Sequence, residues 1–443
     1  MKIQNITAIV LAAGLGTRMK SAVPKVMHLL GHLPLVQHVA KLLDTLGCRE
    51  RILVTSPLME GVRTACKNFT HVIQDKPLGT GHAVLAAQEF ITLAQDILVL
   101  YGDTPLVTHD TIQSMLQKKQ ERGVDLAVLG MKLGNPGDYG RLIETNDGFI
   151  EKIVEYKDAT PEEQAVTFCN SGIMLISGVH ALSLLKSLTN KNAKSEFYLT
   201  DVVELATARG LKTIAVEGSP EEFMGVNCQS DLATVENLFQ WRQRTKFLND
   251  GVRMQDPQTV YFAYDTEIAV DVLIEPHVFF GPGVKIETQS ILRAFSYLED
   301  CTVGENTTVG PFARIRPGTK LGKKVRVGNF VELKNTTVDD GSKIPHLSYI
   351  GDATLGKAVN IGAGTITCNY DGHKKHKTIL EDHVFIGSNS SLVAPITIGE
   401  NAIIGAGSTV TKDVEKEGLA LSRSPQSVIA NGAKKFRAKR VKD

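Results

Sequence analysis

A glycine-rich turn near the start of the chain has the composition of a phosphate-binding loop. It follows the apolar run Ile6 to Leu11 and has the sequence Ala12-Ala13-Gly14-Leu15-Gly16-Thr17-Arg18-Met19, with Pro24-Lys25 soon after it. Small residues let the backbone approach phosphates, and successive N–H groups can form an anion-binding nest, while Arg18 and Lys25 would neutralise charge. The turn is not a dinucleotide fingerprint, because the third glycine is missing, and no Gly-Lys-Ser/Thr makes it a Walker A loop. A simple tight turn is the alternative.

Two further segments point to the same chemistry. Gln74 precedes a second glycine turn that opens a helix, Leu78-Gly79-Thr80-Gly81-His82-Ala83. Tyr101-Gly102-Asp103 follows a strand pattern over 97–100, and open parallel sheets bind ligands at the carboxyl ends of their strands. The Asp103 carboxylate there suits Mg²⁺. A helix N-cap is the other interpretation of this aspartate.

A third group of polar residues lies in the second half of the chain. Arg316 and Lys334 each follow an aliphatic residue, at Ile315 and Leu333, and His346 follows Ile344-Pro345. An imidazole that is neutral near pH 7 can act as a general base, although a lone histidine is more often a solvated or core residue.

The first half of the sequence alternates apolar strand patterns with helical patterns. Strands are predicted at Ile6 to Leu11, Arg51 to Thr55, Ile97 to Leu100 and Leu126 to Met131, and helices at Pro34 to Leu46, Thr80 to Phe90 and His109 to Gln120. This alternation is typical of a Rossmann-like α/β domain with a mostly parallel sheet covered on both faces. It continues to about residue 227, and helical spacing over Gln229 to Asp250 predicts a connecting helix.

The second half has a period of six residues. The repeating aliphatic positions, many of them followed by glycine, are Val303, Val309, Ile315, Leu321, Val327, Leu333, Ile344, Ile350, Ile386, Leu392, Ile398, Ile404 and Val410. This period fits neither a helix nor a simple strand, but it fits a parallel β-solenoid in which each hexad is one side of a coil. A Gly-rich antiparallel sandwich is the alternative, but it would not keep aliphatic residues at one six-residue spacing over so many repeats. Residues Ile274 to Leu292 are expected to form irregular first hexads, and His373 to Lys377 an external loop.

Composition narrows the class of protein. The 443 residues carry 49 Lys+Arg against 48 Asp+Glu, a formal charge of +1, which argues against nucleic acid or an anionic membrane surface as a partner. Apolar stretches are too short to cross a bilayer, and no secretory signal pattern is present. The six cysteines include no CxxC pair, which predicts a reduced, cytoplasmic chain. We predict an α/β domain over 1–228, a linker helix over 229–250 and a solenoid over 251–443.

Taken together, these motifs resemble the sugar-nucleotidyltransferases. More closely, nearly the whole chain resembles the family of bifunctional N-acetylglucosamine-1-phosphate uridylyltransferases / glucosamine-1-phosphate N-acetyltransferases. The resemblance is carried by Tyr139-Gly140-Arg141, Val154-Glu155-Tyr156-Lys157-Asp158-Ala159, Asn170-Ser171-Gly172, Gly225-Val226-Asn227, Gly328-Asn329-Phe330-Val331-Glu332-Leu333-Lys334, His346-Leu347-Ser348-Tyr349 and Asn360-Ile361-Gly362-Ala363. It implies that the solenoid is a left-handed parallel β-helix of hexapeptide repeats.

For the first half, the resemblance implies uridylyl transfer from UTP to N-acetylglucosamine 1-phosphate, with release of pyrophosphate. Asp103 and Asn227 would hold Mg²⁺. Arg18 and Lys25 would bind the triphosphate and assist the phosphoryl transfer. Gln74, Gly79 and Thr80 would read the uracil, and Tyr101, Gly140, Glu155 and Asn170 would contact sugar and ribose. The remaining predicted contacts are those of the first turn, Leu11, Ala12, Ala13 and Gly14. Lys76-Pro77 departs from the family pattern, which has Gln just before Leu78.

For the second half, the resemblance implies N-acetylation of glucosamine 1-phosphate by acetyl-CoA, as the earlier step. His346 would be the general base, and Arg316, Lys334, Tyr349 and Asn360 would bind the acetyl acceptor. The predicted acetyl-CoA contacts are Ala363, Asn369, Tyr370, Ser388, Ala406 and Arg423. A Cys368 nucleophile is the competing mechanism, disfavoured because an amine attacks a thioester directly. Ile344-Pro345 stands where the family has smaller residues.

The resemblance also implies a homotrimer with a shared coenzyme A groove, and a product that feeds the synthesis of cell-wall peptidoglycan and lipopolysaccharide. Two other functions stay open from the residues alone: a sugar-1-phosphate nucleotidyltransferase whose solenoid only assembles, and a scaffold with a nucleotide-sensing domain. The basic tail contains Lys434, Lys435, Arg437, Lys439, Arg440 and Lys442. We interpret it as a solvated chain end, with a weak clamp on the coenzyme A phosphates as the alternative.

Overall fold

The computed structural model of the chain describes residues 5–440. The chain forms two compact units, Met1–Gln240 and Trp241–Asp443. The boundary between them lies within the long helix α8 (Gln229–Asn249), which occupies the segment where the sequence predicts a connecting helix.

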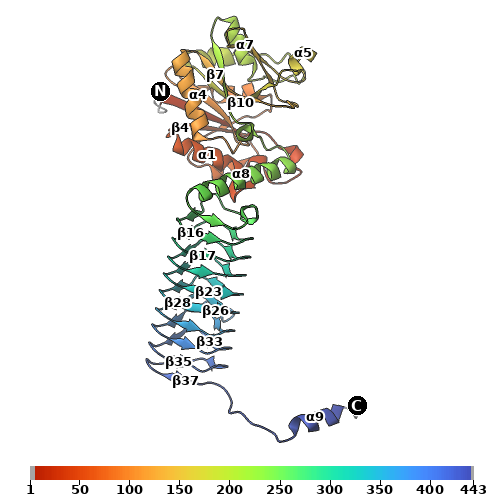
Figure 1. Ribbon diagram of the computed structural model, residues 1–443. Coiled ribbons are helices and arrows are strands. Elements are labelled where there is room, and N and C mark those ends of the chain that lie inside the picture. Colours follow the sequence, from red (N-terminus) through yellow and green to blue (C-terminus); the bar gives the residue numbers. More distant parts are fainter. Residues whose placement is uncertain (1–4, 441–443) are drawn as a thin grey trace. The chain divides into compact units, whose positions relative to one another are not determined.

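The first unit is built on a mostly parallel sheet with the strand order β11-β7-β10-β6-β1-β4-β5 (Figure 1). Strand β10 runs antiparallel to both of its neighbours β6 and β7, and the other pairs along this path are parallel. A hairpin of β8 and β9 pairs with the edge of β10. The strands are β1 (Ile6–Leu11), β4 (Glu50–Thr55), β5 (Thr70–Ile73), β6 (Asp96–Tyr101), β7 (Leu126–Lys132), β8 (Arg141–Glu144), β9 (Ile150–Val154), β10 (Phe168–Ile176) and β11 (Thr213–Glu217), with a small separate pair β2 (Leu29–Leu30) and β3 (Leu33–Pro34).

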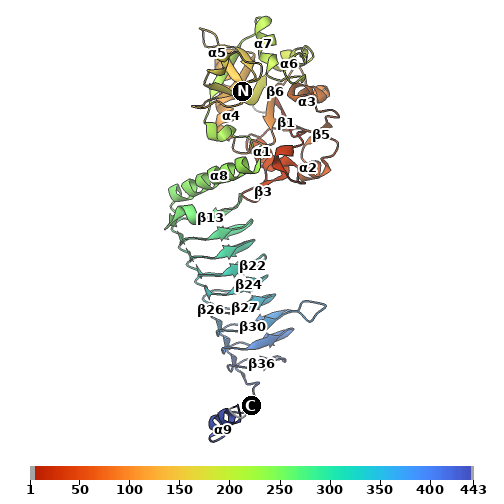
Figure 2. The ribbon, with the colours of Figure 1, turned by 90° about the vertical axis from the view of Figure 1, so that its right-hand side faces the viewer.

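Helices cover both faces of this sheet because its central strands are apolar on both sides. In β1, Ala8 and Val10 pack in one core with α1 (Leu35–Thr45), α2 (Glu60–Ala65) and α4 (His109–Arg122). Ile9 and Leu11 pack in a second core with α3 (Thr80–Ala86), α6 (Gly178–Leu185) and α7 (Asp201–Ala208) (Figure 2). Shorter helical segments are α5 (Pro161–Gln164) and the 3-10 turns Thr17–Met19, Lys25–Met27, Gln88–Phe90 and Pro220–Phe223. The predicted α/β fold class is confirmed, with the helix predicted to Phe90 ending at Ala86.

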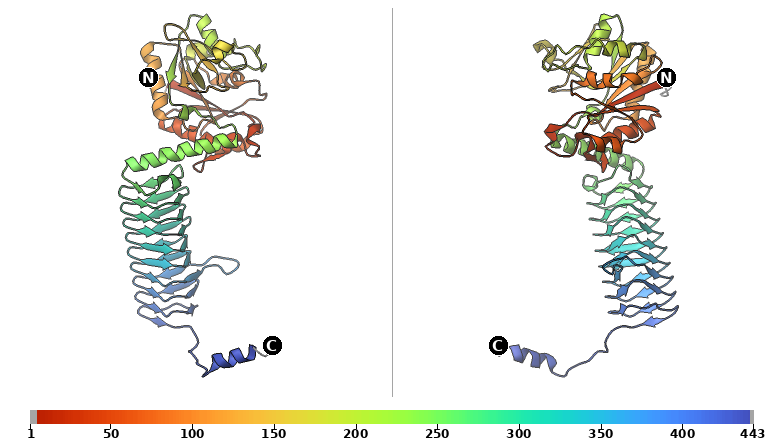
Figure 3. Two further views of the ribbon diagram at one scale, coloured as in Figure 1. Left: turned by 45° about the vertical axis from the view of Figure 1, so that its right-hand side comes forward. Right: turned by 180° about the vertical axis from the view of Figure 1, so that it is seen from behind.

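The second unit is a parallel β-helix whose coils each contribute one strand to three sheets (Figure 3). Sheet 1 contains β12 (Arg253–Met254), β14 (Leu273–Ile274), β17 (Ile291–Leu292), β20 (Thr308–Val309), β23 (Arg326–Asn329), β26 (Lys343–His346), β29 (Asn360–Ile361), β32 (Phe385–Ile386), β35 (Ile403–Ile404) and β37 (Leu419–Ala420). Sheet 2 contains β15 (Phe279–Phe280), β18 (Tyr297–Leu298), β21 (Arg314–Ile315), β24 (Glu332–Lys334), β27 (Tyr349–Gly351), β30 (Ile366–Cys368), β33 (Ser391–Val393) and β36 (Thr409–Val410). Sheet 3 contains β13 (Glu267–Ile268), β16 (Val284–Ile286), β19 (Cys301–Val303), β22 (Thr319–Leu321), β25 (Thr337–Val338), β28 (Ala353–Leu355), β31 (Thr378–Leu380) and β34 (Ile396–Ile398).

The hexad residues form the core of this unit, so the predicted left-handed β-helix of hexapeptide repeats is confirmed. Every predicted inward residue from Val303 to Val410 is buried. The chain enters the β-helix at β12, which a 3-10 turn at Pro257–Thr259 follows, and leaves it before the helix α9 (Gly432–Arg440), which contains most of the basic tail. Lys442 lies outside the described residues. Within residues 5–440, no helix is both long and apolar enough to cross a membrane.

The expectation of irregular first hexads over Ile274 to Leu292 is wrong. Ile274, Phe280, Ile286 and Leu292 are six residues apart, are all buried, and pair in register with the coils that follow. Between these coils and Val303, the step shortens to five residues once, from Leu298 to Val303. Counting back from Val303 in steps of six therefore misses the inward residues of the earlier coils. One of these inward residues, Phe280, is also aromatic, whereas the others are aliphatic.

The turns from sheet 1 to sheet 2, called corner 1–2 below, carry an unusual column of side chains. His277, Phe295, Phe312 and Phe330 each have a φ between 54 and 59° and stack on one another at centroid distances of 4.8 to 5.2 Å. Left-handed backbone is uncommon for aromatic residues, and here the stacked rings compensate for it. Leu347, with a φ of 49°, ends the column.

The segment between β30 and β31 leaves the coil as an external loop, as predicted. Residues 370–375 are exposed, and an antiparallel bridge joins Tyr370 to Lys375. The loop projects from the side of the β-helix in Figures 2 and 3. Because it begins where β30 ends, next to sheet 2, it brings its lysines close to that face of the coil.

Leu292 provides a test of the hexad register in the early coils. Leu292 is fully buried, whereas its neighbour Ile291 on the same strand points outward and is partly exposed. We expect Leu292→Ala to lower the free energy of unfolding of the β-helix by about 2–5 kcal/mol, because it leaves a cavity between stacked coils. Ile291→Ala is the matched control and is expected to cost much less. Equal losses in thermal or urea unfolding of the two variants would contradict this register.

Candidate functional site

Two neighbouring cavities lie in the first unit, at the carboxyl ends of β1 and β6. The larger has a volume of about 640 Å³ and the smaller about 370 Å³. Tyr101, Asp103 and Asn227 line both of them, so these three residues form a shared wall. This position matches the rule that open α/β sheets bind ligands beyond the carboxyl ends of their strands.

The predicted phosphate-binding turn borders the smaller cavity. Leu11, Ala12, Ala13 and Gly14 all line it, together with Lys25. The turn is held in place by backbone bonds on both sides, from Ala12 N to Val54 O at 2.8 Å and from Gly102 N to Leu11 O at 3.0 Å. The backbone of the turn and the aspartate-bearing end of β6 are therefore joined directly.

A cluster of opposite charges and amide groups occupies the shared wall. The Lys25 ammonium contacts the Asp103 carboxylate and donates to Asn227 Oδ1 at 3.2 Å, and Arg18 Nη2 donates to the same oxygen at 3.0 Å. Asp103 and Asn227 are also joined through the backbone, from Val226 N to Asp103 O at 3.0 Å. The N-cap interpretation of Asp103 is wrong, because Thr108 caps α4. The structure thus brings together all four residues predicted to handle phosphate and metal.

The far end of the smaller cavity contains the residues predicted to read a base. Gln74 directly follows β5, and Gly79 and Thr80 begin α3. Gly79 has a φ of 110°, and a Cβ atom there would lie 2.6 Å from the carbonyl oxygen of Phe197. Only glycine fits this turn. Pro77, at the departure from the family pattern, also borders the cavity.

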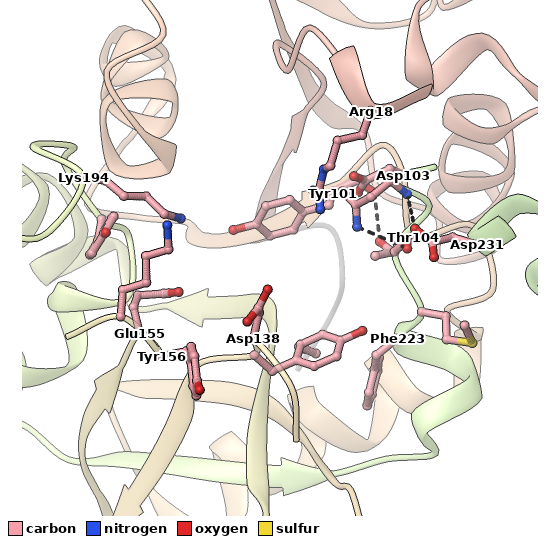
Figure 4. A pocket seen from close by; sticks show the side chains of 17 residues that line it. Arg18, Tyr101, Asp103, Thr104, Asp138, Glu155, Tyr156, Lys194, Phe223 and Asp231 are labelled. Atoms are coloured by element: carbon pink, nitrogen blue, oxygen red, sulfur yellow. Dashed lines mark hydrogen bonds between the residues drawn. The ribbon is translucent and has the colours of Figure 1, made fainter. Parts of the chain in front are cut away.

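The larger cavity is lined by many charged and polar side chains. Figure 4 shows Glu155 and Lys194 on one side, and Arg18 and Asp103 on the other. Burial raises the pKa of the Glu155 carboxyl, and Lys194 nearby offsets part of this rise. Burial also raises the pKa of the Tyr101 phenol, so both groups are poised to donate or accept hydrogen bonds.

Gly140 and Asn170 lie just behind this cavity. Asn170 N donates to Gly140 O at 2.8 Å, and the Asn170 side chain is buried. Several lining residues were missed by the sequence reasoning. Tyr139, Tyr156 and Lys157 belong to motifs that it quoted, whereas Lys194 and Tyr198 belong to a segment without a distinctive pattern.

Arg141 shapes the wall of the larger cavity although it does not line it. Its side chain is 2% exposed and donates to the carbonyl oxygens of Gln164 at 3.2 Å, Gly137 at 3.0 Å and Tyr139. Its guanidinium also lies over the ring of Tyr156 at 5.5 Å. One buried cation thus fixes two wall segments through backbone oxygens, which suits the several donors of arginine.

In the second unit, His346 lies at the end of β26, beside corner 1–2. Its Nδ1 is 2.8 Å from Asn329 Oδ1, one coil away. Because an amide oxygen can only accept, Nδ1 carries the proton and Nε2 is left as the basic nitrogen of a neutral ring. At the departure from the family pattern, Ile344 fills a buried hexad position and Pro345 stays within the strand, so the histidine keeps its register.

A group of cations lies on the sheet 2 side of this histidine. Arg316 is bonded to Glu332 at 2.7 Å, and the Lys375 ammonium lowers the pKa of the neighbouring Lys334. Lys375 comes from the external loop, and sequence reasoning did not select it. The pKa of Asp352 is lowered overall. Burial of the carboxyl acts to raise this pKa, but hydrogen bonds from Asn335 and Asn369 lower it. The positive charges of Lys375 and Lys334 lower it further. Three cations in one place form a natural anion site.

The predicted acetyl-CoA residues follow the same corner beyond His346. Ala363, Ser388 and Ala406 occupy successive turns of corner 1–2, and Arg423 donates to Ala406 O. The column of large side chains ends at Leu347, and smaller residues, Gly364, Asn389 and Gly407, follow at the equivalent positions. Asn369 and Tyr370 begin the external loop. Tyr349 lies on sheet 2 with its hydroxyl over Gly351, whereas Asn360 lies on sheet 1 and is not brought to the same face.

Known proteins with similar sequences identify the family. Residues 8–186 match the MobA-like NTP transferase domain, and residues 300–335 and 377–412 match the bacterial transferase hexapeptide repeats. The Bifunctional protein GlmU of Paramagnetospirillum magneticum is 46% identical over 443 residues, covering 100% of this chain and 98% of that protein. The Bifunctional protein GlmU of Zymomonas mobilis is 44% identical, covering 98% of each. The chain belongs to the GlmU family.

Membership in the GlmU family confirms the predicted resemblance over the whole chain. It also confirms the prediction of a bifunctional transferase, with a nucleotidyltransferase half and a hexapeptide acyltransferase half. The nucleotide-sensing scaffold and the purely assembling solenoid are not favoured. Within the described residues, no group of three or more His, Cys, Asp or Glu side chains is placed to hold a metal ion.

Arg141→Met tests whether the buried guanidinium shapes the sugar pocket. We expect the KM for the sugar phosphate to rise roughly tenfold or more, because three carbonyl oxygens lose their donor. The KM for the nucleotide is expected to change little, since Arg141 does not border the smaller cavity. Arg209→Met, on the exposed surface, is the control. A parallel rise of both KM values would point to general unfolding of the domain.

Proposed function

We propose that this GlmU family member makes UDP-N-acetylglucosamine in two steps at two separate sites. Glucosamine 1-phosphate is first N-acetylated by acetyl-CoA at the β-helix, over residues 251–443. Uridylyl transfer from UTP then follows in the α/β domain, over residues 1–228. The observation that carries this proposal is the presence of two distinct constellations, one around Asp103 and one around His346, in a chain that matches the family from end to end.

Uridylyl transfer needs no protein nucleophile. A phosphate oxygen of the sugar phosphate attacks the α-phosphorus of UTP, a new P–O bond forms, and the bond to the β-phosphate oxygen breaks as pyrophosphate leaves. The smaller cavity takes the nucleotide and the larger takes the sugar, so the attacking and attacked groups meet at the shared wall. Arg18 and Lys25 neutralise the charge that builds up there.

The oxygen atoms of Asp103 and Asn227 fit a Mg²⁺ ion. Both already face one cation, the Lys25 ammonium, and Mg²⁺ in such sites is held by one or two protein oxygens, phosphates and water. When bound, the ion supplies charge neutralisation at the phosphates. Lys25 and Arg18 would contribute positive charge beside it, at the triphosphate.

In the acetyl-transfer step, His346 Nε2 accepts the proton of the glucosamine amine as its nitrogen attacks the thioester carbonyl. The C–N bond forms, the C–S bond breaks, and the coenzyme A sulfur takes up a proton as it leaves. Asn329 holds the ring in the required tautomer. Arg316, Lys334 and Lys375 bind the sugar phosphate, and the small residues of corner 1–2 leave room for the coenzyme A chain. Cys368 is not required.

The acetyltransferase site is proposed to be completed by a second copy of the chain in a homotrimer. Arg316, Lys334 and Tyr349 stand on or beside sheet 2, whereas Asn360 stands on sheet 1, and we infer that the Asn360 of a neighbouring chain completes the site. A neighbouring β-helix against corner 1–2 would also cover its exposed aromatic column. The described cysteines form no disulfides, in keeping with a cytoplasmic enzyme.

Asp103→Ala is expected to lower uridylyl transfer by roughly 100-fold or more, because an electrostatic group at the reacting phosphates is lost. Release of pyrophosphate from UTP measures it. Acetyl transfer by the same sample is the internal control and should remain normal. Near-normal pyrophosphate release at saturating Mg²⁺ would refute the assignment.

His346→Ala is expected to reduce acetyl transfer by roughly 100-fold or more while leaving uridylyl transfer intact. Free thiol released from acetyl-CoA is the readout. Asn329→Ala should cause a smaller fall in kcat with little change in the KM for either substrate, because it acts only through the ring. Lys343→Ala, on the same strand, is the control. Equal loss of both activities would mean that the variant does not fold.

A further inference from the structure

The side chain of Gln74 is held at the edge of the smaller cavity by two acceptors. Its Nε2 donates to the carbonyl oxygen of Gly79 at 3.1 Å and lies 3.0 Å from His82 Nδ1. A carbonyl can only accept, so the atom between these partners is the amide nitrogen. Gln74 is only 6% exposed, and among residues 5–440 its carbonyl oxygen Oε1 has no hydrogen-bond partner.

His82 does not line the cavity, so it contacts the cavity only through Gln74. It stands in the first turn of α3, which is tied to a neighbouring segment by bonds from Gly81 N to Phe197 O at 2.8 Å and from Leu199 N to Thr80 Oγ1 at 3.1 Å. Its ring lies 6.3 Å from that of Phe197. The histidine is thus fixed by its helix and by its packing, and it presents a fixed acceptor to the amide.

We propose that His82 is a positioning residue that sets base selectivity by holding the Gln74 amide with Oε1 towards the nucleotide. This inference rests on the proposed function, in which Gln74 reads the base. Uracil presents an N3–H donor to Oε1, whereas cytosine has an unprotonated N3 that would face the same oxygen lone pairs. If the amide could rotate, Nε2 would donate to cytosine N3. A fixed amide therefore favours uracil, because Oε1 accepts from its N3–H. It also disfavours cytosine, because the lone pairs of Oε1 and of cytosine N3 repel each other.

Two substitutions separate the acceptor from the ring. His82→Phe keeps an aromatic ring against Phe197 but removes Nδ1. His82→Asn removes the ring but places an amide oxygen where Nδ1 was. With the full-length chain and saturating sugar phosphate, kcat/KM is measured for UTP and for CTP by pyrophosphate release, and acetyl transfer reports on folding.

For His82→Phe, we expect the ratio of kcat/KM for UTP over CTP to fall about fivefold or more, since one hydrogen bond is lost and an amide N–H is left unpaired. The KM for UTP should rise while kcat stays near normal. His82→Asn should restore the ratio to near the wild-type value. An unchanged ratio in His82→Phe, or an equal fall in both variants, overturns the inference.

The proposed function can fail separately. If the wild-type chain releases no pyrophosphate from either nucleotide, the proposed function is wrong. The ratio of Kd values for UTP and CTP, measured by calorimetry on the wild type and both variants, then decides the role of His82 by the same criteria.

Discussion

The contact of Lys25 with the oxygens of Asp103 and Asn227 is the interaction on which the first active site depends. These residues come from the 3-10 turn Lys25–Met27, from the end of β6 and from the segment before α8, so they are far apart in sequence. Lys25 thus pairs with Asp103 and donates to Asn227, the two residues proposed to hold Mg²⁺. The parallel strands β1 and β6 end at one edge of the sheet, and this geometry makes the convergence possible.

The second active site depends on a different constraint, the stacking of successive coils in register. A strand in one coil lies directly against its equivalent in the next, so Asn329 meets His346 and the corner residues form a column. The column is aromatic before His346, and smaller residues follow Leu347 in it. His346, the proposed general base, therefore stands beside the place where the corner changes from stacked rings to smaller side chains.

Much of this could be predicted from the sequence because it depends on local patterns. The strand–turn at Leu11 to Gly14, the end of β6 at Asp103 and the hexads from Val303 onward each carry their signal within a few residues. The early hexads were misjudged because one five-residue step after Leu298 shifts the phase. Lys375, Lys194 and Arg141 could not be assigned in this way, since their importance arises from tertiary contacts between segments without periodic pattern.

The wall shared by the two cavities of the α/β domain limits how this enzyme can diverge. Tyr101, Asp103 and Asn227 line both cavities, so under the proposed function a substitution in any of them would alter nucleotide and sugar handling together. Gln74 and Glu155 each border only one compartment. A descendant that accepts a new base or a new sugar would therefore change at these outer ends, while the middle of the site stays as it is.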